Sequence, residues 1–182
     1  MQSGRLLARY DIRTPRLSDA AALADAYDRN RAHLSPYEPR RSEDFYTTEV
    51  QRESIRVSLD AQAHGRAAGW LILDDVGVAG RINLNNVVHG VLRSADLGYW
   101  IDRTATGQGL ATAAVEFACN AAKELGLHRI GASTLIDNAP SQAVLHKCGF
   151  QQIGSAPSYL FIDGKWRDCD LFQRILHDEP VS

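Results

Sequence analysis

A glycine-rich loop that joins a short strand pattern directly to a long helix pattern restricts the fold more than any other feature. The loop reads Thr106-Gly107-Gln108-Gly109-Leu110-Ala111-Thr112. Residues 95–101 before it alternate in polarity as a strand does, and residues 109–125 after it place apolar side chains on one helical stripe. Glycines let a backbone approach a ligand, and the N–H groups and dipole at a helix start attract an anion. The sequence therefore predicts a phosphate-binding loop in a strand–loop–helix unit.

Several interpretations of this loop compete. A Walker A site does not fit, because the only Gly-Lys pair, Gly164-Lys165, continues into Trp166 and lacks the upstream glycine. A dinucleotide site would require Gly or Ala at Thr112 and more β-α-β units after the loop, although Asp137 could serve it as a ribose ligand. A coenzyme A pyrophosphate site is the third interpretation, and a tight turn that binds nothing is the fourth.

The remaining pattern predicts an α/β (α+β) fold with a mixed sheet of about seven strands and helices on both faces. Strands are expected at 6–13, 70–73, 78–88, 95–101, 129–135, 159–162 and 170–176, with helices near 20–27, 48–63, 109–125 and 139–147. A chain of 182 residues can bury about two-thirds of its surface without disulfides or metals. We therefore expect one domain over residues 1–182.

Composition argues against several classes of protein. The net charge is −2 and no basic stripe is present, so a nucleic-acid partner is not expected. Three widely spaced cysteines indicate reduced thiols, and the six histidines show no metal-ligand spacing, so no metal is expected. No stretch approaches the ~18 apolar residues of a membrane span, and no leader pattern opens the chain, so the prediction is a cytoplasmic protein without a membrane partner.

Three motifs in order point to one family. They are Leu97-Gly98-Tyr99-Trp100-Ile101, the loop Gly107-Gln108-Gly109-Leu110-Ala111-Thr112, and Asn138-Ala139-Pro140-Ser141 followed by Gly149-Phe150. Together they resemble the GNAT superfamily of acyl-CoA-dependent N-acetyltransferases, and within it the branch that acetylates the N-termini of ribosomal proteins. The segment Leu34-Ser35-Pro36-Tyr37-Glu38-Pro39 resembles that branch's acceptor-side loop. The resemblance covers nearly the whole chain.

The resemblance implies acetyl-CoA as co-substrate and a splay between the fourth and fifth strands, 95–101 and 129–135. It assigns the pyrophosphate to the backbone amides of Gly107, Gln108, Gly109, Leu110, Ala111 and Thr112. The backbone of Tyr99, Trp100 and Ile101 is expected to pair with the pantetheine arm, which requires the splay to leave unpaired backbone groups. Asn138 is expected to hold the same arm, and Ser141 to lie near the sulfur.

The chain departs from the family pattern at three places. Thr106 stands where many members have Arg or Gln, and Leu145 stands where many members have a tyrosine that acts as an acid. Leu160 stands where some relatives have a glutamate. The resemblance therefore assigns no general base. Through a water molecule, Glu38, Asp96 or His89 could remove the amine proton, and Glu38 joins Ser141 as a predicted catalytic residue.

The chemistry itself indicates the kind of amine. A protein α-amine has a pKa near 7.7–8.0 and is partly neutral at pH 7, whereas a lysine with a pKa near 10.4 is almost fully charged. A site without a strong base therefore favours an α-amine, and Tyr37, Glu38, Asn83 and Tyr99 are predicted to line its cleft. The prediction is an N-acetyltransferase for a protein N-terminus, such as that of a ribosomal protein. Alternatives are an acetyltransferase for a small amine such as an antibiotic, and a non-catalytic acyl-CoA-binding module. The family resemblance also leaves a homodimer open.

Overall fold

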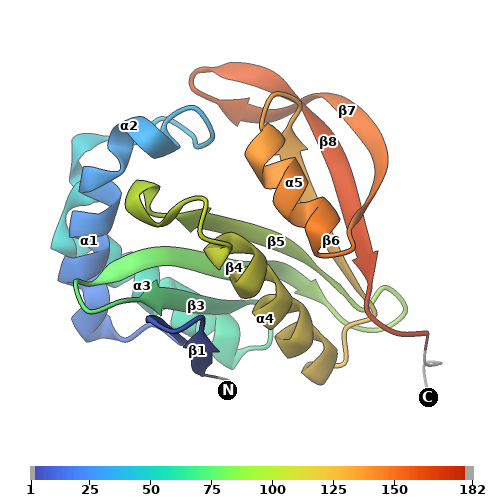
Figure 1. Cartoon of the computed structure of the whole chain (residues 1–182), viewed down its shortest axis with the longest axis horizontal. Coiled ribbons are helices and arrows are strands. Elements are labelled where there is room, and N and C mark those ends of the chain that lie inside the picture. The colour runs from blue at the N-terminus through green and yellow to red at the C-terminus, as the bar shows by residue number, and fades with distance from the viewer. Residues whose placement is uncertain (1–2, 179–182) are drawn as a thin grey trace.

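The computed structural model describes residues 3–178, and their centre is one eight-stranded sheet (Figure 1). The strands follow the order β1-β2-β3-β4-β5-β6-β8-β7, and β5 with β6 forms a parallel pair among antiparallel neighbours. Their bounds are β1 Gly4–Leu6, β2 Tyr10–Arg13, β3 Ala68–Leu73, β4 Val78–Val88, β5 Ser94–Ile101, β6 Arg129–Leu135, β7 Gln151–Ile162 and β8 Lys165–Ile175. The predicted mixed α/β sheet is confirmed.

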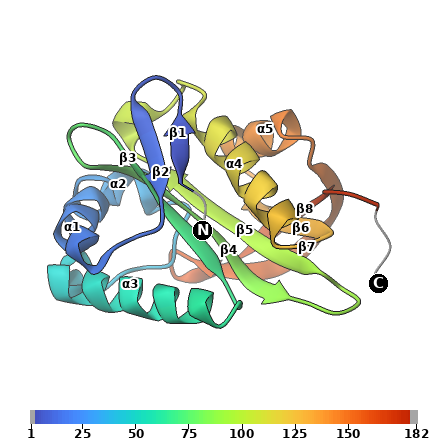
Figure 2. The same cartoon turned by 90° about the horizontal axis from the view of Figure 1, so that it is seen from below.

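Helices cover both faces of this sheet (Figure 2). They are α1 Ala20–Arg29, α2 Arg31–Leu34, α3 Thr48–Ala63, α4 Leu110–Glu124 and α5 Ala139–Lys147. On one face, α4 and α5 bury Leu110, Ala118 and Leu145 against Ile82 and Leu84 of β4. On the other, α1 and α3 bury Leu23 and Ile55 around Trp100. The alternation along β4 and β5 supplies both cores, because successive side chains point to opposite faces.

The prediction of one strand over 6–13 is wrong. Leu7 adopts the left-handed conformation, with φ of 56°, and the chain turns back to pair β1 with β2. The sheet consequently has eight strands instead of about seven. The last two strands, β7 and β8, are also longer than expected.

The predicted splay lies between β5 and β6. Their parallel pairing covers three residue pairs and ends at Asp96 with Gly131. Beyond that point β5 continues to Ile101 and β6 to Leu135 without pairing to each other. Two strands that diverge leave backbone N–H and C=O groups available to a ligand that lies between them.

Within residues 3–178, no helix has both the length and the apolar character needed to cross a lipid bilayer. The same part of the chain contains no group of three or more His, Cys, Asp or Glu side chains arranged to hold a metal ion. The predicted domain limits, 1–182, extend beyond the described residues at both ends.

Candidate active site

A cavity of ≈ 410 Å³ lies at the splay. Four segments enclose it: the end of β5, the glycine loop with the start of α4, the first turns of α5, and the segment around α2. From these segments, the lining residues include Tyr99, Trp100, Ile101, Gly107, Gly109, Leu110, Ala111, Thr112, Asn138, Ser141, Tyr37 and Glu38. Most of the residues that the sequence predicted for the coenzyme and the acceptor therefore surround one space.

The glycine loop presents an open backbone to this cavity. Gly107 and Gly109 both have positive φ, 74° and 77°, and Gly109 is the residue from which α4 begins. A Cβ atom added to either glycine would meet nothing within 4 Å. The loop thus combines a conformation that favours glycine, free space beside the backbone and the first N–H groups of a 15-residue helix. Such a geometry can accommodate an anion such as a phosphate.

A buried carboxylate fixes the loop to α1. Asp102 is 3% exposed and accepts hydrogen bonds from Arg29 Nε at 2.7 Å, Asn30 Nδ2 at 2.8 Å and Thr104 N at 2.9 Å. Asn30 Oδ1 in turn accepts from Arg103 N at 2.9 Å. Although burial alone would raise the pKa of Asp102, these donors stabilise the charged form and lower its pKa to about 2. No motif or spacing in the sequence indicates this contact between Asp102 and α1.

A pair of hydroxyl groups lies across the cavity from the loop. Asn138 Oδ1 caps α5 by accepting from Ser141 N at 3.2 Å, which presents the Ser141 side chain at the helix start. Ser141 Oγ lies 2.9 Å from Tyr99 Oη. Burial raises the pKa of Tyr99 to about 12, so its phenol stays protonated at neutral pH. Tyr99 Oη and Ser141 Oγ can therefore form a chain of hydrogen bonds that ends at a group in the cavity.

Glu38 supplies a partly buried carboxylate to the same space. Its side chain is 22% exposed and lies 3.5 Å from Arg41 Nη2. Burial raises the pKa of Glu38, while the positive charges of Arg41 and Arg81 oppose the rise. Arg81 also acts on the hydroxyl of Tyr27, whose pKa is raised by burial. Trp100 Nε1 donates a hydrogen bond to the Tyr27 hydroxyl at 3.0 Å. The charges of Arg81 and Glu38 both act on this hydroxyl, which lies beside the aromatic core.

An ion pair crosses the outer side of this region. Arg40 Nε lies 2.9 Å from Asp163 Oδ1, which joins the segment 35–41 after α2 to the turn between β7 and β8. In Figure 1 this segment and the β7–β8 hairpin approach each other from the two sides of the molecule. Both ion-pair residues line a smaller hollow of ≈ 240 Å³, which shares Leu34 and Glu38 with the main cavity.

Two predicted residues do not line the cavity. The side chain of Gln108 lies away from it, because Gln108 Nε2 donates to Thr104 O at 3.0 Å and Gln108 Oε1 accepts from Tyr10 Oη at 3.3 Å. Asn83 lies on β4, where its Oδ1 accepts from Arg81 Nε at 3.2 Å. Cavity-lining residues that sequence reasoning missed include His33 of α2 and Ala105 before the loop.

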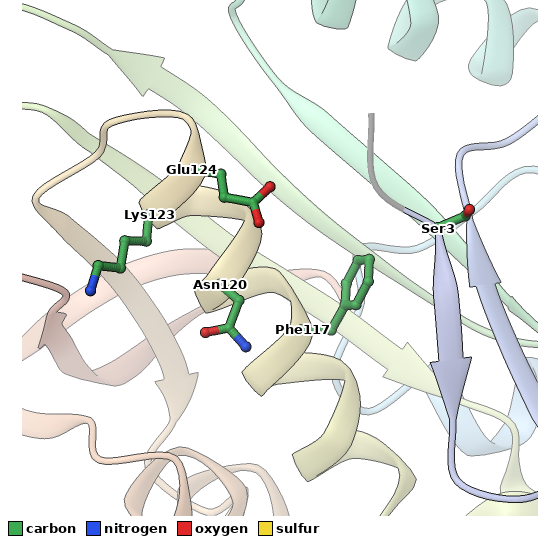
Figure 3. Close-up of a pocket in the computed structure, with 5 residues that line it drawn as sticks. All are labelled: Ser3, Phe117, Asn120, Lys123 and Glu124. Carbon is green, nitrogen blue, oxygen red and sulfur yellow. The ribbon is translucent and has the colours of Figure 1, made fainter.

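A third hollow, of ≈ 660 Å³, lies between α4 and the start of β1 (Figure 3). Ser3, Phe117, Asn120, Lys123 and Glu124 line it. In Figure 3 the charged ends of Lys123 and Glu124 point apart, and Ser3 lies across the hollow from them. These polar groups do not converge on a common point, as the groups of a ligand site would.

Comparison with known proteins identifies the family. The family model described as an acetyltransferase (GNAT) domain matches residues 9–151, which include the splay, the glycine loop and α5. The chain belongs to the GNAT acetyltransferase family. The resemblance expected from the sequence is thus confirmed, and the protein is an acetyl-CoA-dependent N-acetyltransferase.

Relatives within the GNAT family share the whole fold. The [ribosomal protein uS5]-alanine N-acetyltransferase of Escherichia coli (strain K12) is 34% identical over 156 residues, which are 82% of this chain and 79% of that protein. The ribosomal-protein-S5-alanine acetyltransferase from Vibrio fischeri superposes with a TM-score of 0.93 at 30% identity, covering 99% of this chain and 100% of the other. Mycobacterium smegmatis RimJ, in complex with CoA-disulfide, gives a TM-score of 0.86 at 34% identity over 91% of this chain and 81% of its own.

Proposed function

We propose that this GNAT protein transfers the acetyl group of acetyl-CoA to the N-terminal α-amine of a protein, such as a ribosomal protein. The observation that carries the proposal is the cavity at the splay, which joins an anion-binding loop to a pair of hydroxyl groups and a partly buried carboxylate. Two relatives whose names state ribosomal-protein alanine acetylation are at least 30% identical to this chain.

The loop and the free edge of β5 suit the two ends of the coenzyme. We assign the pyrophosphate to the amides of residues 107–112, where the helix dipole of α4 favours negative charge. Tyr99, Trp100 and Ile101 pair with β4, but their edge toward β6 has no strand partner and can pair with the amides of pantetheine as an added strand does. This arrangement brings the thioester toward Ser141 and Tyr99.

The reaction needs a donor for the developing oxyanion and a donor for the departing thiolate. A backbone N–H of β5 near Gly98 to Trp100 can supply the first. We assign the second to the Ser141 hydroxyl, which Tyr99 supports by its own O–H at 2.9 Å. Because a thiol has a pKa near 8.5, the thiolate leaves with modest assistance.

The acceptor side fits an α-amine. Glu38 is the carboxylate that faces the cavity, and it can attract a protonated amine and accept its proton through water. Tyr37 lines the same side. No strongly basic group is required, since an α-amine is partly neutral at pH 7 whereas a lysine is not.

A thiol-release assay with a panel of amines tests the proposal. Peptides that begin with Ser or Ala should react faster than the same peptides with blocked N-termini, free lysine, or amine antibiotics. Small first residues are expected because the nitrogen must come within about 3–3.5 Å of the thioester carbon. Equal rates with blocked peptides, or a large preference for an antibiotic, would favour the small-amine alternative.

A further inference from the structure

Three arginines, Arg31, Arg40 and Arg41, line the smaller hollow of ≈ 240 Å³. Arg31 is already paired, since its Nε and Nη1 lie 2.7 and 2.8 Å from the carboxylates of Asp28 and Glu43. The other two arginines belong to the segment that follows α2, and each has a carboxylate on one side only. Arg40 and Arg41 are therefore the cations that could hold an anionic group in this hollow.

The guanidinium group of Arg41 is fixed against an aromatic ring but is weakly paired. Its Cζ lies 4.4 Å from the centre of the Phe45 ring, which is a cation–π contact. The Arg41 side chain is 35% exposed, and its Nη2 lies 3.5 Å from Glu38 Oε2. A charge-assisted hydrogen bond is normally about 2.7–2.9 Å long, so this contact is a loose one. Arg41 can therefore donate to a second carboxylate without giving up a strong bond.

The turn between β7 and β8 holds the guanidinium group of Arg40. Its residues Asp163 and Gly164 have positive φ, 49° and 78°, as in a tight hairpin turn. Asp163 Oδ1 accepts from Arg40 Nε at 2.9 Å, and a Cβ added to Gly164 would lie 3.2 Å from Arg40 Cζ. A glycine thus lets the guanidinium group lie close to the turn. In the part of the chain that the structure describes, no hydrogen bond uses Nη1 or Nη2 of Arg40, so both remain for a ligand.

The smaller hollow adjoins the main cavity, because Leu34 and Glu38 line both. An acceptor whose α-ammonium group pairs with Glu38 therefore has its next residues at the mouth of the hollow. An extended chain advances about 3.3–3.6 Å per residue. Since Arg41 lies 3.5 Å from Glu38, the side chain that reaches it belongs to residue 2 or 3 of the acceptor.

We propose that the smaller hollow binds an acidic side chain of the acceptor, Asp or Glu at residue 2 or 3, through Arg40 and Arg41. The α-ammonium group pairs with Glu38, and the acceptor's own carboxylate becomes the partner of Arg41 in place of Glu38. Each partly buried charge then keeps a partner of opposite sign, which avoids the cost of an unpaired charge. The substrate class is a protein N-terminus with a small first residue and an acidic residue at one of the next two positions. This inference rests on the proposed function and adds the sequence that its acceptor carries.

Pairs of Ala-initiated peptides with amidated C-termini test the site in the wild type. Each pair differs only by Asp or Asn at residue 2, 3 or 8. At residue 2 or 3 the Asp peptide should have a kcat/KM about ten- to a hundredfold higher, as expected for a charge-assisted hydrogen bond. At residue 8, which is about 20 Å or more along an extended chain, Asp and Asn should react equally. Added salt should reduce the preference. If free alanine, whose carboxylate is its own, reacts as fast as the Asp peptides, the assignment to a peptide side chain is wrong.

The double variant Arg40→Gln, Arg41→Gln tests the two arginines. The ratio of kcat/KM for the Asp and Asn peptides should fall to about one, and this ratio cancels any change at Glu38 because both peptides use that residue. Arg56→Gln is the matched control, since Arg56 pairs with Glu53 on the exposed side of α3 and should keep the wild-type ratio. The rise in melting temperature on adding coenzyme A should persist in both variants, which shows that they fold.

Two results would overturn the inference: equal rates for Asp and Asn at residues 2 and 3 in the wild type, or a wild-type ratio in the double variant. Failure of the proposed function has a different signature. The wild type would then acetylate no peptide of either kind, and the inference would fall with it.

Discussion

Replacing Asp102 by asparagine removes the charge that holds the glycine loop to α1. The folded carboxylate accepts from Arg29, Asn30 and Thr104, and an asparagine has one oxygen to offer them and turns an NH2 group toward the rest. Leaving buried donors unpaired should lower the free energy of unfolding by about 2–4 kcal/mol. For a chain of this size, the melting temperature should fall by roughly 5–15 °C. Coenzyme A affinity should fall with it, because the loop loses its anchor.

The effect should depend on pH in a definite direction. Folding lowers the pKa of Asp102 from 3.8 to about 2, so its stabilising contribution is present above pH 3.8 and disappears as the pH falls toward 2. A shift of this size corresponds to about 2 kcal/mol. The difference in unfolding free energy between the wild type and Asp102→Asn should therefore narrow by about that amount between pH 5 and pH 2.

Urea unfolding followed by circular dichroism at several pH values measures this difference. Asp163→Asn is a suitable control, because Asp163 pairs with Arg40 at an exposed site and should contribute less than about 1 kcal/mol. A difference that stays constant with pH, or one no larger than that of Asp163→Asn, would refute the anchoring role of the Asp102 charge.

Further predictions concern the reaction. Ser141→Ala should lower turnover about ten- to a thousandfold with little change in coenzyme A binding. Wild-type turnover in this variant would show that Ser141 only helps to begin helix α5. Adding Tyr99→Phe to Ser141→Ala should lower turnover little further, because the two hydroxyls form one chain of hydrogen bonds. If the two losses of turnover add up in stopped-flow assays, the hydroxyls act independently. Gly109→Val should abolish the stabilisation by coenzyme A in thermal melts, since φ of 77° strains valine and its side chain fills the space beside the loop. Arg81→Gln should raise the pKa of Glu38 further, because it removes a positive charge, and the acidic limb of the kcat/KM profile should move to higher pH; an unmoved limb would exclude Glu38 as its origin.

The strand–loop–helix unit could be predicted because its signals are local. Alternation in 95–101, two glycines and a helical stripe each depend on neighbours in sequence, and the structure has β5, the loop and α4 at these places. The same is true of α5, where Asn138 caps the helix and Pro140 occupies its first turn.

The parts that could not be predicted depend on contacts between distant residues or on unusual backbone. Arg29 and Asn30 meet Asp102 across more than 70 residues, and no spacing in the sequence indicates that contact. Leu7 turns the chain with a left-handed backbone that leucine rarely adopts, so the sequence of residues 6–13 predicts one strand where the structure has a hairpin. Arg81, Asn83 and Asn85 did leave a signal, since polar residues that alternate with apolar ones in an inner strand indicate a face that is only partly covered.

The ion pair between Arg40 and Asp163 joins two parts of the chain that lie more than 120 residues apart, the segment 35–41 and the turn between β7 and β8. Both residues line the smaller hollow, which also contains Glu38. Because both partners of the pair are exposed, added salt should weaken their attraction. The width of this hollow should therefore depend on ionic strength, whereas the buried contacts of Asp102 on the other side of the cavity should not respond to it.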